Sequence, residues 1–178
     1  DMGALADWFL EHRMADGGWN CEWVNGSTRS SFHSTLNALK GLLDYARHRD
    51  PERVAAARRG GAEYLLERRL LVRRSTGATV GEFALRQGYP FLWLYSALNA
   101  LDHFREASLF DGTPPDPRMA EAVERRRLAR RPDGTWLQQG RLKGAMWFEI
   151  DAPQGEPSKW LTLIGTRVLA WWDQAANT

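Results

Sequence analysis

The sequence contains very little cysteine and no long apolar run. Cys21 is the single cysteine among 178 residues, which excludes an internal disulfide framework. No stretch is apolar over the length that a membrane-spanning helix needs, and we find no hydrophobic region of the signal-peptide kind. We therefore expect a cytoplasmic protein without a transmembrane segment.

Net charge is nearly absent as well. The chain has 24 Lys and Arg residues against 22 Asp and Glu residues, so its formal net charge is only +2, and a pI near 8.9 does not indicate a nucleic-acid partner. Its arginine clusters lie beside glutamates on segments with helical spacing, and no Gly-rich phosphate loop accompanies them. We interpret the clusters as a salt-bridged surface that faces solvent. They comprise Arg58 and Arg59, Arg68 and Arg69, Arg73 and Arg74, residues 125–127, and Arg130 and Arg131.

Tryptophan, in contrast, is abundant. Nine tryptophans in one small protein must either pack between elements or line a cavity, because scattered exposure would leave their large apolar surfaces in water. A hydrophobic content of 43% over 178 residues is enough for one compact core. We therefore predict a single domain over residues 1–178.

The spacing of apolar residues predicts helices over most of the chain. Three segments have a charged face, at 2–13, 52–71 and 118–131, and three are mostly apolar, at 34–48, 91–104 and 159–173. Ser158 is a suitable N-cap for the last of them. Residues 73–90 contain turn residues and weak periodicity, which predicts a long loop with a short strand-like piece at 80–83, and a second loop is expected at 137–157.

Two short motifs recur in phase with this helix pattern. The sequence Leu-Asn-Ala-Leu occurs at 36–39 and again one unit later at 98–101. The sequence Asp-Gly-Gly-Trp at 16–19 recurs two units later as Asp-Gly-Thr-Trp at 133–136. The period is about sixty residues, which indicates stacked helix pairs. The three units cover about 1–48, 52–104 and 117–173.

The first unit carries a recognisable spacing. Trp8, Phe9, Arg13, Gly17 and Trp19 resemble the QW repeat of the terpenoid cyclase and protein prenyltransferase superfamily, which includes squalene-hopene cyclases, with Arg at the Gln position and Phe at the aliphatic one. The later units keep parts of the pattern, namely Gly61, Tyr64 and Leu65 with Arg69, and then Arg130, Gly134 and Trp136.

This resemblance implies an all-α fold, an α/α toroid in which charged outer helices alternate with apolar inner ones. Three pairs are about half of the family's ring, so we expect an incomplete toroid. Either a missing half from a longer protein, of which this chain is a fragment, or a homo-oligomer would complete it.

The family's chemistry does not transfer to these residues. The Asp-x-Asp-Asp acid of the cyclases is absent, so enzyme status stays open. Zinc, which prenyltransferases bind, would need Cys21 and His33 with an acid such as Asp16 or Glu22, and this spacing matches no known ligand pattern. A lone cysteine is usually a small buried hydrophobe. We expect no metal and no cofactor.

The candidate ligand-binding residues lie near the starts of the inner helices, where the expected ring has its mouth, and on the long loop after the second Gly-Trp motif. A cavity with aromatic walls suits both a prenyl chain and a sugar face. In the blander interpretation His33 is a solvated or capping residue, the aromatic rings belong to the core, and the carboxylates face water. The candidates are His33, Asn37, Trp93, Tyr95, Trp147, Glu149, Asp151 and Trp160.

Three functions are open at this point. The first is an apolar or isoprenoid-like ligand held on the inner-helix face. The second is a carbohydrate-active α/α barrel, in which Trp93, Tyr95 and Trp147 stack on sugar rings and Glu149 or Asp151 acts as acid or base. The third is a structural scaffold of helical repeats.

Overall fold

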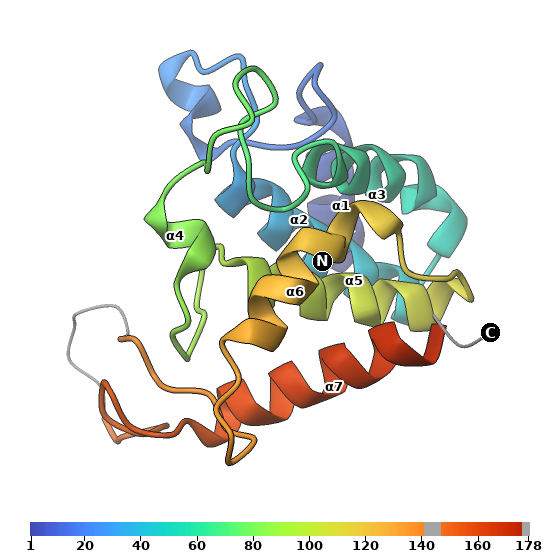
Figure 1. Ribbon diagram of the computed structural model, residues 1–178. Helices are drawn as coiled ribbons and strands as arrows, with labels where there is room; N and C mark the ends of the chain where they lie inside the picture. The colour runs from blue at the N-terminus through green and yellow to red at the C-terminus, as the bar shows by residue number, and fades with distance from the viewer. Residues whose placement is uncertain (141–146, 176–178) are drawn as a thin grey trace. The chain divides into compact units, whose positions relative to one another are not determined.

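The computed structural model describes residues 1–140 and 147–175, and its regular elements there are all helices (Figure 1). Two isolated antiparallel bridges, Val72 with Thr79 and Leu137 with Pro157, are the other backbone pairings of note. The prediction of an all-α fold is confirmed. Among the described residues, no helix combines the length and apolar character that crossing a bilayer requires. The chain divides into two compact units, Asp1–Arg68 and Arg69–Thr178.

The first unit contains three α-helices and a short 3-10 helix. Its elements are α1 (Met2–Glu11), η1 (Cys21–Asn25), α2 (Phe32–His48) and α3 (Pro51–Leu66). Ser31 caps α2 by accepting from the backbone N–H of Ser34, and Asp50 caps α3, whose first residue is Pro51. Buried leucines of α2 pack against α3, and α1 contacts both helices.

The second unit is built around α5, α6 and α7, which pack against one another in pairs. Its elements are α4 (Glu82–Leu85), α5 (Ala97–Asp111), η2 (Pro117–Met119), α6 (Ala120–Leu128) and α7 (Lys159–Ala175). Figure 1 shows α5 and α7 running side by side. The core between them includes Leu98, Leu101, Leu161 and Val168, all buried. Ser158 caps α7, because its Oγ accepts from the backbone N–H of Leu161 at 2.9 Å.

Three of the predicted elements are wrong for identifiable reasons, two in a boundary and one in its type. The helix expected at 91–104 begins later, at Ala97, because Leu92 has a φ of 48° and the hydroxyl of Ser96 caps the helix start. The helix expected at 52–71 ends at Leu66, since Arg69 and Leu70 also have positive φ. The strand-like piece expected at 80–83 is replaced by the short helix α4. Of the loop expected at 137–157, residues 141–146 lie outside the described residues.

The two Asp-Gly-x-Trp motifs fold into the same corner, each within its own unit. Both second residues are glycines in the left-handed region, Gly17 with a φ of 97° and Gly134 with 85°, where other residues would be strained. Each glycine donates its N–H to the carbonyl three residues earlier, at 2.9 Å. Both tryptophans are buried, Trp19 at 3% exposure and Trp136 at 0%.

The hydrogen bonds of the two tryptophans also correspond. The backbone N–H of Trp19 donates to Thr35 Oγ1 at 3.1 Å, and that of Trp136 donates to Thr162 Oγ1 at 3.2 Å. In each case the indole N–H donates to a carbonyl ten residues earlier. Trp19 donates to Phe9 at 2.7 Å, and Trp136 donates to Arg126 at 2.9 Å. Each tryptophan therefore joins the helix before the turn, through its indole N–H, to the helix after the turn, through its backbone N–H.

Candidate functional site

An aromatic cavity lies beside the segment that leads into α5. Its volume is about 50 Å³, and its lining is mainly apolar. The hydroxyl of Tyr95 donates to the carbonyl of Leu70 at 2.7 Å, and its ring meets the Phe83 ring edge-on. Because that hydroxyl is already bonded, Tyr95 offers the cavity its ring. The lining residues are Phe83, Arg86, Gly88, Pro90, Phe91, Leu94, Tyr95, Ser96 and Gly140.

Glutamines hold one wall of this cavity in place by joining two distant loops. Gln138, only 2% exposed, donates from Nε2 to the carbonyl of Tyr89 at 2.6 Å and accepts from the Tyr89 N–H at 3.0 Å. Gln139 and Gln87 make a second reciprocal pair, at 2.7 and 2.9 Å. The side chains thus substitute for the backbone ladder that these irregular segments lack.

Asp151 and Trp160 meet at the start of α7. Asp151 Oδ2 accepts from the hydroxyl of Ser158, the helix cap, and from Gln138 Nε2 at 3.4 Å. Its Oδ1 is buried and has no hydrogen bond to the residues that the structure describes. The indole of Trp160 donates to the carbonyl of Ile150 at 3.1 Å and stacks on Tyr89 with ring centroids 5.4 Å apart. These contacts anchor the loop that precedes α7.

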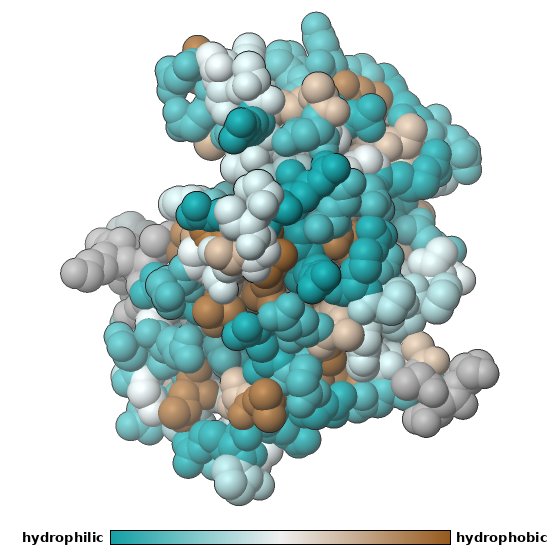
Figure 2. All heavy atoms as spheres, turned by 45° about the horizontal axis from the view of Figure 1, so that its top comes forward, coloured by the Kyte–Doolittle hydropathy of each residue, from teal (hydrophilic) through white to brown (hydrophobic). Residues whose placement is uncertain are grey.

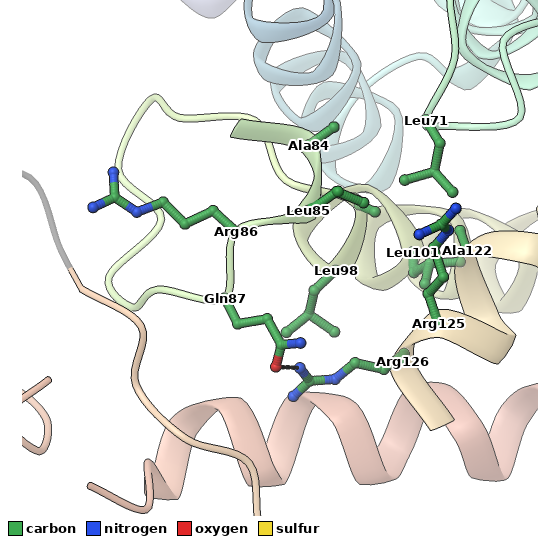
Figure 3. Close-up of a pocket in the computed structure, with 11 residues that line it drawn as sticks. Leu71, Ala84, Leu85, Arg86, Gln87, Leu98, Leu101, Ala122, Arg125 and Arg126 are labelled. Atoms are coloured by element: carbon green, nitrogen blue, oxygen red, sulfur yellow. Dashed lines mark hydrogen bonds between the residues drawn. The ribbon is translucent and has the colours of Figure 1, made fainter. Parts of the chain in front are cut away.

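A second cavity, of about 40 Å³, lies among α4, α5 and α6 (Figure 3). Leucine and alanine side chains form most of its wall. Arg126, which is 4% exposed, reaches across one end to bond Gln87 Oε1, and its Nη2 donates to the carbonyl of Leu161 at 2.8 Å. The lining residues are Leu71, Ala84, Leu85, Arg86, Gln87, Ala97, Leu98, Leu101, Ala122, Arg125 and Arg126.

Arg126 corrects the prediction that residues 125–127 all face solvent. Arg125 pairs with Glu121 at 3.0 Å and Arg127 with Asp173 at 2.6 Å, as a salt-bridged face requires. The Arg126 guanidinium instead lies over the Trp136 ring at 4.3 Å, and its burial lowers its pKa to about 9. The sequence contained an indication that Arg126 is buried, because Met119, Ala122 and Val123 precede it at the spacing of one helix face.

The predicted site residues fall into several places. In the second unit, Tyr95 lines the aromatic cavity, and Asp151 and Trp160 share the start of α7. Trp93 is 59% exposed, and Trp147 and Glu149 are exposed on the loop. In the first unit, His33 lies inside the first turn of α2, where its carbonyl accepts from Asn37 Nδ2 at 2.8 Å.

Tyr89 and Gln138 were missed because nothing in an irregular stretch marks a residue as the hydrogen-bond partner of a distant one. Cys21, expected to be buried, is exposed. Among the described residues no three His, Cys, Asp or Glu side chains gather as a metal site would require.

Most of the surface visible in Figure 2 is hydrophilic, with apolar residues in separate small patches. Comparison with protein-family models, curated proteins and solved structures gives no match.

Proposed function

We propose that this chain is a helical-repeat domain of the α/α-toroid type, similar to terpenoid cyclases, that binds an apolar, isoprenoid-like ligand near the start of its mostly apolar helices. The observation that carries the proposal is the duplicated Gly-Trp corner. In both copies an indole bonds an earlier carbonyl while the tryptophan N–H bonds a threonine of the next helix. Such a joint is compatible with a ring of alternating outer and inner helices, in which each pair packs against its neighbours.

The aromatic cavity supports the class of ligand. Phe83, Phe91 and Leu94 supply apolar surface, and the hydroxyl proton of Tyr95 is already donated to the carbonyl of Leu70. A water-sized group needs roughly 10–15 Å³ of such space, so a cavity of about 50 Å³ is suited to one five-carbon isoprene unit. The proposal is for binding and not for a reaction, because the cyclase acid motif is absent from the sequence.

The carbohydrate-active alternative receives less support. A general acid or base must reach the substrate, whereas Asp151 Oδ2 is engaged by the helix cap Ser158 and by Gln138. Its contacts favour a role in positioning the loop.

Titration with prenol, geraniol and farnesol, followed by tryptophan emission, tests the proposal. Leu94→Phe fills the aromatic cavity and is expected to weaken binding by about tenfold or more, as lost apolar contact and overpacking combine. Leu163→Phe is the matched control, because Leu163 lies on α7 with 52% exposure and outside the cavity lining. Equal affinity in the two variants would contradict the proposed location.

A second comparison separates ligand contact from packing. Phe91→Ala is expected to weaken binding more than Trp171→Ala, since Phe91 lines the aromatic cavity, whereas Trp171 is 9% exposed and its indole donates to Ser108 Oγ. Quenching by oligosaccharides in place of isoprenoid alcohols would support the carbohydrate function. Silence with both ligand classes would support a scaffold.

A further inference from the structure

In the second Gly-Trp corner Arg126 stands at the position that the uncharged Phe9 has in the first. The carbonyl that accepts from the indole belongs to Phe9 in the first corner and to Arg126 in the second. The Phe9 ring meets Trp19 edge-on at 6.2 Å, whereas the Arg126 guanidinium lies over Trp136 at 4.3 Å. An apolar side chain therefore serves the first corner, and the charge in the second requires a separate explanation.

The charge of Arg126 is poorly compensated by the protein. In the part of the chain that the structure describes, its hydrogen-bond partners are the neutral oxygens of Gln87 and Leu161, and its Nε has none. Only two of the five guanidinium N–H groups are thereby used. A buried cation is unfavourable unless an anion accompanies it.

The cavity beside Arg126 has the composition of a site for a small organic anion. Among the described residues, its charged or polar lining consists of three arginines and Gln87, without an Asp or Glu. Arg125 is paired with Glu121, so Arg126 is the buried cation that lacks a carboxylate. In Figure 3 the Arg126 guanidinium lies at one end and aliphatic side chains, including Leu98 and Leu101, cover much of the remainder, while Arg86 points away.

We propose that this cavity binds a short-chain monocarboxylate, whose carboxylate pairs with Arg126 and whose alkyl group contacts Leu98 and Leu101. Space for one water-sized group is roughly 10–15 Å³, so about 40 Å³ suits acetate or propionate and is too small for a six-carbon chain. The paired anion would offset the burial of the guanidinium. The two linings have Arg86 in common, but the site does not depend on the function proposed for the aromatic cavity.

The test measures binding of propionate to the full chain by thermal unfolding and by line broadening of the propionate NMR signals, with sodium chloride at matched ionic strength. Arg126→Met is expected to weaken propionate binding by about tenfold or more, the loss typical of a charged hydrogen-bond partner. Arg127→Met is the control, because Arg127 lies on the same helix, pairs with Asp173 and is outside the cavity lining. Equal binding by both variants, or no propionate effect beyond that of chloride, would overturn the proposal.

A size series on the unaltered protein gives an independent result if Arg126→Met does not fold. Acetate and propionate are expected to bind at least about tenfold more tightly than hexanoate, because the cavity restricts length. Affinity that is equal for all three, or that rises with chain length, would place the anions on the surface and refute the site.

Discussion

Gly61→Ala adds a methyl group where α3 meets the Trp19 ring. The new Cβ would lie 2.6 Å from Trp19 Cζ3 and 3.0 Å from Leu39 Cδ2, both too close for undisturbed contact. Overpacking of a core costs about 1–3 kcal/mol. Alanine also stabilises a helix interior by about 1 kcal/mol relative to glycine. The net effect should therefore lie between about 0 and 2 kcal/mol of destabilisation.

Gly41→Ala supplies the matched control in the neighbouring helix α2. Apart from the helix's own backbone, no atom of the described residues lies within 4 Å of the Cβ that this change would add. Only the helix preference then acts, and the protein should gain about 0.5–1 kcal/mol. Subtracting the two results removes the helix term and leaves the clash with Trp19 and Leu39, which should amount to about 1–3 kcal/mol.

Urea unfolding at 25 °C, followed by circular dichroism at 222 nm and by tryptophan emission, measures both free energies. A thermal scan should separate the two variants by about 2–4 °C for each kcal/mol. If Gly61→Ala stabilised the protein as much as Gly41→Ala does, the packing of α3 on the Trp19 ring would be wrong.

Four further substitutions test individual contacts. Thr35→Val and Thr162→Val each remove the acceptor of a tryptophan N–H and should cost similar amounts, about 1–3 kcal/mol by urea unfolding; a large effect of only one would contradict the equivalence of the corners. Tyr95→Phe should cost a comparable amount yet leave binding of isoprenoid alcohols unchanged, since the ring remains; lost binding with normal stability would refute the structural role of its hydroxyl. Burial raises the pKa of Tyr64 above its ordinary value of 10. The contribution of Tyr64 to the free energy of unfolding should therefore be complete below pH 10 and lost as pH rises through the folded-state pKa. The free energy of unfolding measured across that range should depend less on pH in Tyr64→Phe.

The helices and both Gly-Trp corners were accessible from the sequence because their causes are local. Ser158 caps α7 as expected, and a glycine followed two residues later by tryptophan marks each corner. Helical spacing of apolar residues identified α2 and α7 nearly to their ends. In these segments local preference and burial point to the same structure.

Other features depend on contacts between residues far apart in the sequence. Phe91 to Tyr95 have apolar side chains that suit a helix, yet the segment is irregular and α5 begins only at Ala97. Tyr89, the reciprocal partner of Gln138, lies about fifty residues away, and periodicity carries no information on such pairs. Arg126 was misjudged for a different reason, since its charge was given more weight than its place on the buried face of α6.

The hydroxyl of Ser158 couples the loop before α7 to the helix itself. Its oxygen accepts from the N–H of Leu161, while its proton is directed to Asp151. If Asp151 moved away, the hydroxyl of Ser158 would be free to rotate. Its hydrogen bond from Leu161 N–H, and with it the first turn of α7, would then be weaker. Amide exchange at Leu161 should consequently accelerate whenever the loop detaches, so the two segments would open as one kinetic unit.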